Sequence, residues 1–291
     1  MAASLSVEVP IRSGQWNDVR LGVIMPGMSA TISSTSLLDR VFVVLDACAA
    51  SRRTLSLADL ARQTGLPKTT LHRLCWKLES LGALEQHQDG FRIGAKLFAL
   101  GAVNPRVQRL RTASMPFLYE MAASTGHVAN LAIMEEGRAL LIDEVFAAEK
   151  PVPRMVGARL PLHATALGKV LLGAQPPRVR RELVGRDFLP AFTRNTIVRP
   201  NVLLEQLEVV ARSGISYSRE EWRLGFAGVA ASVHVDGKLA GALALVGIPR
   251  AMDVERYGAT VRAAADGLAE ALKHPVIRDA AAWAGEDDLT L

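Results

Sequence analysis

The chain has 291 residues, which is near the upper limit for a single hydrophobic core and therefore predicts two domains. Hydrophobic residues make up 49% and charged residues 22% of the sequence, so an intrinsically disordered protein is excluded. The longest apolar stretch, 239–248, is about half as long as a membrane helix requires, and the first 30 residues lack the pattern of a secretory signal. Two cysteines cannot form a disulfide framework in a chain of this size, so we expect a cytoplasmic protein.

The net charge of +5 is unevenly distributed along the chain. Residues 34–115 contain twelve basic and six acidic side chains, whereas the remaining sequence is close to neutral. A basic module joined to a nearly neutral one predicts that the first module binds a polyanion.

In chain order, residues 1–33 have no sustained period and predict a flexible arm, and residues 34–94 predict the basic module. Its first helix begins at Leu37 after the N-cap Ser36. Ser56 and Asp59 form a capping box that opens a second helix, which Gly65 ends, and Pro67 starts a third. A hairpin over 83–93, with its turn at residues 89–90, completes the module.

Residues 95–113 predict a helical linker with a break at 104–105, residues 114–275 a second domain, and residues 276–291 a frayed tail. In the second domain, alternation predicts strands over 127–134, 139–145, 215–218, 229–235 and 239–246. Helical periodicity predicts helices over 165–173, 178–184, 201–213 and 252–273. Strands in one sheet with helices on one side would make an α+β domain.

The second and third helices have the spacing of a helix-turn-helix. Ala61 is small where two helices cross, and Gly65 supplies the left-handed turn four residues later. The third helix would enter the major groove of DNA. The hairpin over 83–93 would form a wing beside it that carries Arg92. The predicted DNA contacts on that helix are Lys68, Thr69, Thr70, His72, Arg73 and Lys77. A basic face that binds another protein is the alternative, and Trp76 would either pack on the wing or contact an outside molecule.

With these residues placed, the chain resembles the IclR family of bacterial transcriptional regulators from about Leu37 to about His274. The likeness is carried by the strings GLPKTTLHRL at 65–74, FRIG at 91–94 and LHATALGK at 162–169, in that order. The resemblance implies a winged helix-turn-helix, a helical linker that dimerises, and a GAF-like or profilin-like C-terminal domain that holds a small effector. It also implies that the effector is often a carboxylate or an aromatic acid from a catabolic pathway.

The resemblance places the effector near the start of the helix at residue 165, with Ala166 and Leu167 contacting it through main-chain groups. The other positions carried over are Leu160, Ser218, Phe226, Gly228, Ala244 and Val246. This chain departs from the family pattern at Gly228, where many members have cysteine, and at 242–246, where well-known members have serines. We therefore expect a roomier, more apolar cavity that accepts an aromatic or longer aliphatic body.

Other chemistry is poorly supported by the sequence. The Gly168–Lys169 pair lacks the rest of a phosphate-binding loop, and Ser232, His234 and Asp236 are too far apart along one strand to form a triad. No second Cys/His pair accompanies His72 and Cys75, so we expect neither a metal nor a cofactor. Further expectations are that His163 is a buried hydrogen-bonding residue, that Cys75 is core, and that Glu220 and Glu221 cap a turn or pair with Arg219 or Arg223.

The sequence thus predicts an effector-responsive transcriptional regulator, not an enzyme, that binds a near-palindromic double-stranded DNA operator as a homodimer or homotetramer. The alternative is an enzyme of unknown reaction fused to a DNA-binding domain. Turnover of the ligand would separate the two functions.

Overall fold

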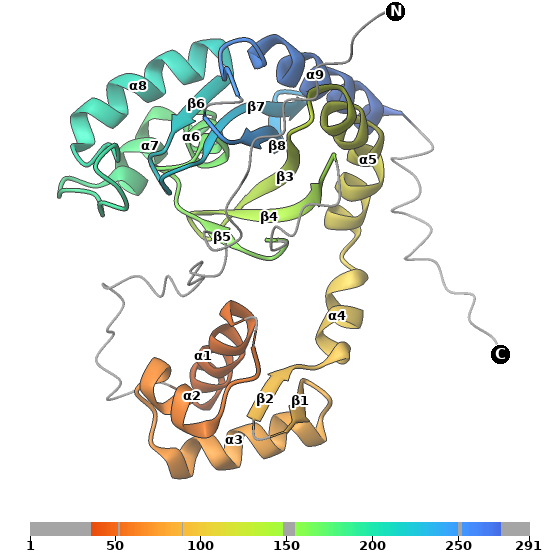
Figure 1. The fold of residues 1–291 in the computed structure, drawn as a ribbon, viewed down its shortest axis with the longest axis vertical. Helices are drawn as coiled ribbons and strands as arrows, with labels where there is room; N and C mark the ends of the chain where they lie inside the picture. Colours follow the sequence, from red (N-terminus) through yellow and green to blue (C-terminus); the bar gives the residue numbers. More distant parts are fainter. Residues whose placement is uncertain (1–35, 52, 89, 148–154, 250–251, 275–291) are drawn as a thin grey trace, which may run out of the picture. The chain divides into compact units, whose positions relative to one another are not determined.

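A computed structural model describes residues 36–51, 53–88, 90–147, 155–249 and 252–274. The predicted arm 1–33 and the tail 276–291 lie outside the described residues. The chain divides into two compact units, residues 1–103 and 104–291 (Figure 1). Within the described residues, no helix combines the length and the apolar character needed to cross a bilayer.

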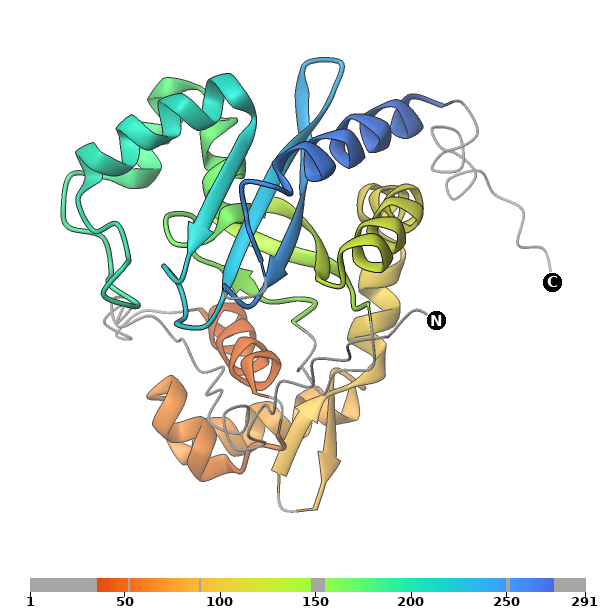
Figure 2. The ribbon, with the colours of Figure 1, turned by 45° about the horizontal axis from the view of Figure 1, so that its top comes forward.

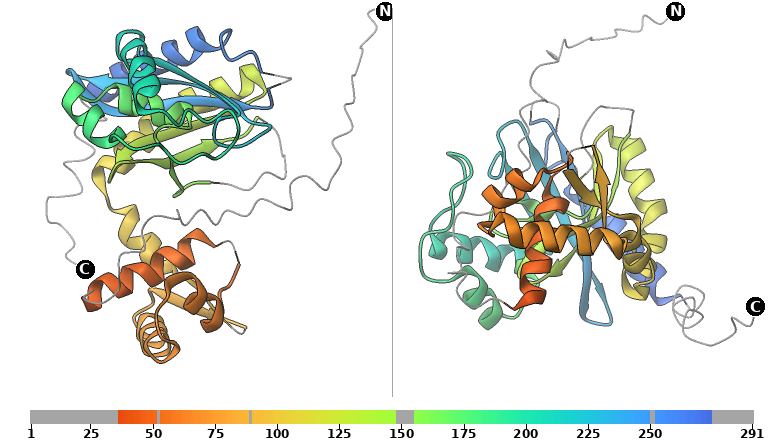
Figure 3. Two further views of the ribbon diagram at one scale, coloured as in Figure 1. Left: turned by 90° about the vertical axis from the view of Figure 1, so that its left-hand side faces the viewer. Right: turned by 90° about the horizontal axis from the view of Figure 1, so that it is seen from below.

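The first unit consists of a helical bundle and a two-stranded hairpin. Its elements are α1 (Leu37–Ala50), α2 (Leu57–Thr64), α3 (Lys68–Ser80), β1 (Leu84–His87), β2 (Gly90–Ile93) and α4 (Ala95–Ala102). The capping box of Ser56 with Asp59 is confirmed, and Ser36 forms a second one with Asp39. Gly65 ends α2 with a φ of 70°, the left-handed conformation that a side chain would disfavour. In the right-hand view of Figure 3, the hairpin lies beside α3.

The hairpin turns one residue earlier than the sequence predicted. Gly90 is paired with His87 in the strand ladder, so the turn falls at Gln88, which has a φ of 51°, and at residue 89, which lies outside the described residues. Gly90 is needed in the strand because a Cβ there would lie 2.5 Å from the carbonyl oxygen of Leu55. Leu55 in turn exchanges two backbone hydrogen bonds of 2.9 Å with Phe91, which ties the hairpin to the segment before α2.

The second unit is a six-stranded antiparallel sheet with helices on both faces. Its helices are α5 (Pro105–Thr125), α6 (Ala166–Gly173), α7 (Pro177–Val184), α8 (Pro200–Ser213) and α9 (Gly258–Lys273). Its strands are β3 (Val128–Glu135), β4 (Arg138–Val145), β5 (Arg159–Leu160), β6 (Ile215–Arg219), β7 (Ala227–Val235) and β8 (Lys238–Gly247). The strand order is β5-β4-β3-β8-β7-β6, and every neighbouring pair is antiparallel.

The α+β class is confirmed, but the expectation of helices on one side of the sheet is wrong. Alternate residues of β3, β7 and β8 bury two separate apolar clusters, one on each face. The first cluster packs the sheet against α5 and α9, and the second packs it against α6, α7 and α8 (Figure 2). The central strands are apolar on both faces because both faces are covered.

The start of one helix and the presence of one short strand also differ from the sequence prediction. Helix α9 begins at Gly258 rather than at residue 252, because residues 252–257 form turns that bury Met252 and Val254 in the first cluster. Strand β5 was not predicted, since two residues carry no periodicity.

Candidate functional site

Helix α3 has an apolar buried face and a basic exposed face. Leu71, Leu74, Cys75 and Leu78 are buried in the core of the first unit. The predicted DNA contacts lie on the other face, where Thr70 is half-buried and five are exposed: Lys68, Thr69, His72, Arg73 and Lys77. No ion pair holds the three cations among these five within the described part of the chain. These three positive charges are therefore available to bind a polyanion.

Trp76 connects the exposed face of α3 to the wing. Its indole N–H donates to Nε2 of His72 at 3.0 Å, and its ring lies edge-on to Phe91 of β2 with the centroids 5.7 Å apart. Trp76 therefore packs on the wing, although 40% of its surface stays exposed. Because Nε2 accepts this hydrogen bond, a neutral His72 carries its proton on Nδ1.

The wing carries less free charge than the sequence suggested. Arg92 is exposed on β2, but it forms an ion pair with Glu85, directly opposite on β1, at 3.0 Å. The Glu85 carboxylate also accepts from the backbone N–H of Ala95, and these hydrogen bonds lower the pKa of Glu85. A phosphate would have to compete with this carboxylate for Arg92.

In the second unit, four of the predicted effector positions share one apolar cluster, on the sheet face covered by α6. These four are Leu160 on β5, Ala166 and Leu167 at the start of α6, and Ala244 on β8. Gly228 and Val246 pair across β7 and β8, next to the pair formed by Ala230 and Ala244. The half-buried Phe226 directly precedes β7.

Gly228 does not add the room that the sequence suggested. A Cβ at this position would lie 3.2 Å from the Leu245 carbonyl oxygen, 3.4 Å from Cγ2 of Val246 and 3.6 Å from Cβ of Ala166. The space left by the missing side chain is therefore no larger than a methyl group. The glycine instead lets β7 approach the first turn of α6 closely.

The first turn of α6 is an oriented group of backbone donors. Thr165 caps the helix, accepting through its hydroxyl from the N–H of Gly168 at 3.0 Å. The N–H groups of Ala166 and Leu167 have no partner among the described residues. Ser218 donates its hydroxyl hydrogen to the Ala164 carbonyl at 3.1 Å, which helps to hold this turn against the sheet. Two unsatisfied N–H groups at a helix N-terminus favour an anion.

Asn130 is a polar residue on the same sheet face that the sequence analysis did not select. It lies on β3 between Ala244 of β8 and Glu144 of β4, and it is 7% exposed. Its buried Oδ1 has no hydrogen-bond partner within the described residues. The available signal was one polar side chain in the apolar run 128–134, because burying such a group unpaired is costly.

A buried ion pair fixes the loops beside α6. Nζ of Lys169, which is fully buried, contacts the two carboxylate oxygens of Glu221 at 2.7 and 2.9 Å. Burial lowers the pKa of Lys169, and the Glu221 carboxylate opposes that shift. Thr196 donates to the Glu221 carbonyl at 2.6 Å, so this segment is also tied to the loop before α8. The sequence predicted that Glu220 and Glu221 cap a turn or pair with Arg219 or Arg223. Glu220 does cap a turn, because its carboxylate accepts from the backbone N–H of Gly225 at 2.7 Å, whereas Glu221 pairs with Lys169 instead.

The remaining candidates have structural roles. His163 is 7% exposed and its Nε2 lies 2.9 Å from the Pro190 carbonyl, as the sequence predicted. Its ring also stacks on Phe192. Cys75 is fully buried, and burial raises the pKa of Cys48 to about 11 and of Cys75 to about 12. Neither thiol is therefore an available thiolate. In the described part of the chain, no three His, Cys, Asp or Glu side chains form a metal-binding group.

Comparison with known proteins identifies both units. The model of the IclR helix-turn-helix domain matches residues 37–88, and the model of the bacterial transcriptional regulator IclR C-terminal domain matches residues 106–270. The chain belongs to the IclR family. It is therefore a DNA-binding transcriptional regulator with a C-terminal effector-binding domain, and not an enzyme.

Relatives give the family match more detail. The glycerol operon regulatory protein of Streptomyces coelicolor is 32% identical over 68% of this chain and 78% of its own length. The transcriptional repressor IclR of Escherichia coli is 30% identical over 67% and 73%. A crystal structure of an IclR homolog from Microbacterium hydrocarbonoxydans, complexed with 4-hydroxybenzoate, has a TM-score of 0.71 and 27% identity, and covers 82% of this chain and 99% of that one.

Proposed function

We propose that this regulator controls a catabolic operon in response to an organic acid with an aromatic or longer aliphatic body. The observation that carries the proposal is the pair of N–H groups at Ala166 and Leu167, which have no partner among the described residues and lie against an apolar sheet face. The backbone donors would bind the carboxylate, and the apolar side chains would contact the body. Relatives that regulate glycerol and acetate operons support the catabolic role.

Oδ1 of Asn130, which has no partner among the described residues, supplies a second polar contact for the effector. An amide oxygen accepts a hydrogen bond, so it would pair with a hydroxyl on the far end of the effector. The 4-hydroxybenzoate bound by the Microbacterium relative carries a carboxylate and a hydroxyl at opposite ends. We infer that an acid of this pattern fits here better than one without a hydroxyl.

The effector inference is tested with 4-hydroxybenzoate and benzoate as probes. We expect the full chain to bind 4-hydroxybenzoate more tightly by titration calorimetry, and Asn130→Ala to reduce that preference while benzoate binding stays the same. The matched control is Asn195→Ala, an exposed side chain outside the apolar cluster. Binding of neither probe, or an unchanged preference in Asn130→Ala, would contradict the assignment.

On the DNA side, we propose that the contacts are Lys68, Thr69, Thr70, His72, Arg73, Lys77 and, more weakly, Arg92. The regulator would bind a near-palindromic operator as a homodimer or homotetramer, because two recognition helices must meet two half-sites. The test is selection of bound duplexes from a random pool at near-physiological salt. An enriched inverted repeat is expected. Weak binding without sequence preference, in the presence and absence of the acids, would instead indicate a general DNA-coating protein.

A further inference from the structure

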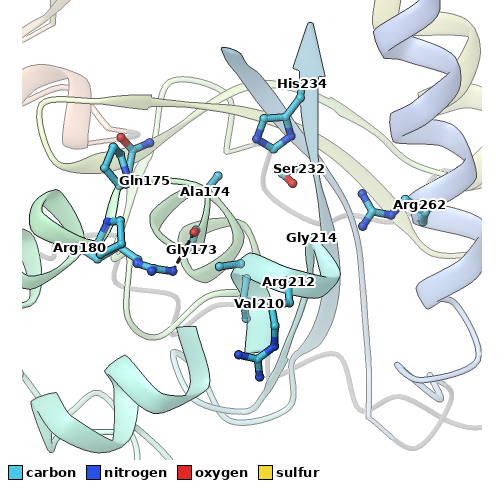
Figure 4. Close-up of a pocket in the computed structure, with 13 residues that line it drawn as sticks. Gly173, Ala174, Gln175, Arg180, Val210, Arg212, Gly214, Ser232, His234 and Arg262 are labelled. Atoms are coloured by element: carbon cyan, nitrogen blue, oxygen red, sulfur yellow. Dashed lines mark hydrogen bonds between the residues drawn. The ribbon is translucent and has the colours of Figure 1, made fainter. Parts of the chain in front are cut away.

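A pocket lies at the edge of the sheet, apart from the residues proposed for the effector. Strand β7 continues past the first residue of β6, so that Ser232 and His234 face a hollow of about 520 Å³ (Figure 4). The ends of α6 and α8, at Gly173 and Gly214, form the opposite wall, and Arg262 of α9 completes it. Its volume is in the range of pockets for small organic ligands.

The ionisable side chains that line this pocket are all basic or neutral. They are Arg180, Arg212, His234 and Arg262, and no aspartate or glutamate is among the lining residues. Burial and, to a smaller extent, the charge of Arg262 lower the pKa of His234. An anion in the pocket would be attracted by the three arginines that line it.

Two of the arginines also have structural roles that leave donors free. Arg180 donates through Nη1 to the carbonyls of Gly173 and Leu207 and pairs with Glu208 at 2.9 Å. Arg262 donates Nη2 to the Ser213 carbonyl and is 4.0 Å from Asp266. A guanidinium has five N–H donors, so Arg262 retains several for a ligand. In Figure 4 its guanidinium points toward the strand that carries Ser232.

Ser232 is an independent indication that this pocket receives a ligand. The residue is 4% exposed and lines the pocket, yet its hydroxyl makes no hydrogen bond with any described residue. By contrast, Ser216 and Ser218 on the neighbouring strand both donate to carbonyls at the start of α6. The Ser232 side chain is thus open to a basic pocket and not engaged with the described part of the protein, and such a hydroxyl can donate to an oxyanion.

We propose that this pocket binds a small organic oxyanion, a carboxylate or a phosphate monoester, distinct from the effector bound at α6. Ser232 and Arg262 hold the anionic group, and Arg212 approaches from the rim. The rest of the molecule lies along Val210 and Pro176, which supply apolar surface on the opposite wall. The regulator would then have two sites for two different small molecules.

The test is titration calorimetry of the full chain with glycerol 3-phosphate, succinate and, as an uncharged control, glycerol. We expect at least one of the two anions to bind, and glycerol not to bind. Binding of glycerol 3-phosphate alone would assign a phosphate monoester, and binding of succinate alone would assign a carboxylate. Binding of neither anion would overturn the proposal.

Variants separate a built site from general attraction to a basic surface. Arg262→Gln and Ser232→Ala should each weaken anion binding by about tenfold or more, since hydrogen bonds to charged groups contribute that much. Arg178→Gln removes an equal charge from an exposed residue outside the pocket and should change nothing. Equal losses in all three variants would overturn the proposal. If Arg262→Gln does not fold, Ser232→Ala decides alone, because its hydroxyl holds no other residue.

Binding of 4-hydroxybenzoate should be the same in Ser232→Ala and in the unmodified chain. This control keeps the two proposals separate, because the α6 site can fail while the edge pocket still binds an anion. Loss of both ligands in Ser232→Ala would show one shared site and would overturn the claim of a second one.

Discussion

The two units of the chain bury different kinds of side chain. In the described part of the first unit, Thr64 is the one polar residue that is buried, and all predicted DNA contacts lie outside the core. The second unit buries Asn130, His163, Lys169, Glu221 and Ser232, among other polar residues. The first unit therefore acts through an exposed surface on an apolar frame, whereas the second places its polar chemistry inside the fold.

This difference predicts where substitutions will be most damaging. A polar group on the surface of the first unit can be lost with little effect on folding, because water replaces its contacts. A buried polar group in the second unit leaves a desolvated partner behind when it is removed. Changes at the DNA surface should therefore alter affinity at constant stability, and changes inside the effector unit should alter both.

The largest expected effect follows from breaking the buried ion pair. Glu221→Gln leaves the ammonium of Lys169 buried without a counter-charge, so the free energy of unfolding should fall by about 3–5 kcal/mol. Chemical denaturation of the full chain, followed by tryptophan fluorescence, measures this loss. The double change Lys169→Met with Glu221→Leu should recover most of it, because no lone charge remains.

The matched control for that experiment is Glu182→Gln. Glu182 pairs with Arg178 at 2.8 Å, but 59% and 86% of their side chains are exposed. Its removal should cost less than about 1 kcal/mol. A Glu221→Gln protein as stable as this control would show that the buried pair does not hold the second unit together.

Removing a recognition side chain should act on binding alone. Arg73 is exposed on α3 without an ion pair among the described residues, so Arg73→Ala should not change the unfolding free energy appreciably. If Arg73 contacts a base edge, Arg73→Ala should weaken binding to the selected operator by about 1–3 kcal/mol and should relax the base preference at one position. Competition binding with single-base operator variants measures this. Equal losses on operator and random DNA would assign the residue to a phosphate instead.

The wing should contribute less than α3 to electrostatic binding. Lys68 has no ion pair in the described structure, whereas Arg92 is held by Glu85 at 3.0 Å. Lys68→Gln should reduce the slope of log affinity against log salt by about one, as expected for one phosphate contact. Arg92→Gln should reduce it by less. The reverse order would show that DNA displaces Glu85 and frees the wing arginine.

The same contrast explains what could be predicted from the sequence. The N-cap at Ser36, the capping box at Ser56, the turn at Gly65 and the basic face of α3 are local patterns, and the predicted helices around them are confirmed. The partner of Glu221 is Lys169, 52 residues away, and the orphan oxygen of Asn130 depends on strands β4 and β8. No local spacing encodes such contacts. Long-range pairing also decided where Gly90 lies, because the carbonyl of Leu55 requires a glycine opposite it.

The smallest expected effect concerns the pH dependence of the second unit. Burial lowers the pKa of His163 below its ordinary 6.5, so the unfolded chain takes up a proton before the folded protein does. The contribution of His163 to the free energy of unfolding should therefore be constant above about pH 7. It should fall as the pH drops through 6.5 toward the lower pKa of the folded state.

The variant His163→Gln can still donate to the Pro190 carbonyl but cannot titrate, so its free energy of unfolding should fall less over the same range. Urea denaturation at several pH values between about 7.5 and 5 measures both slopes. His234, whose pKa is also lowered, is present in both proteins and cancels in the difference. Parallel curves would mean that His163 is not buried as a neutral group, and that the polar interior of the second unit is open to water at this position.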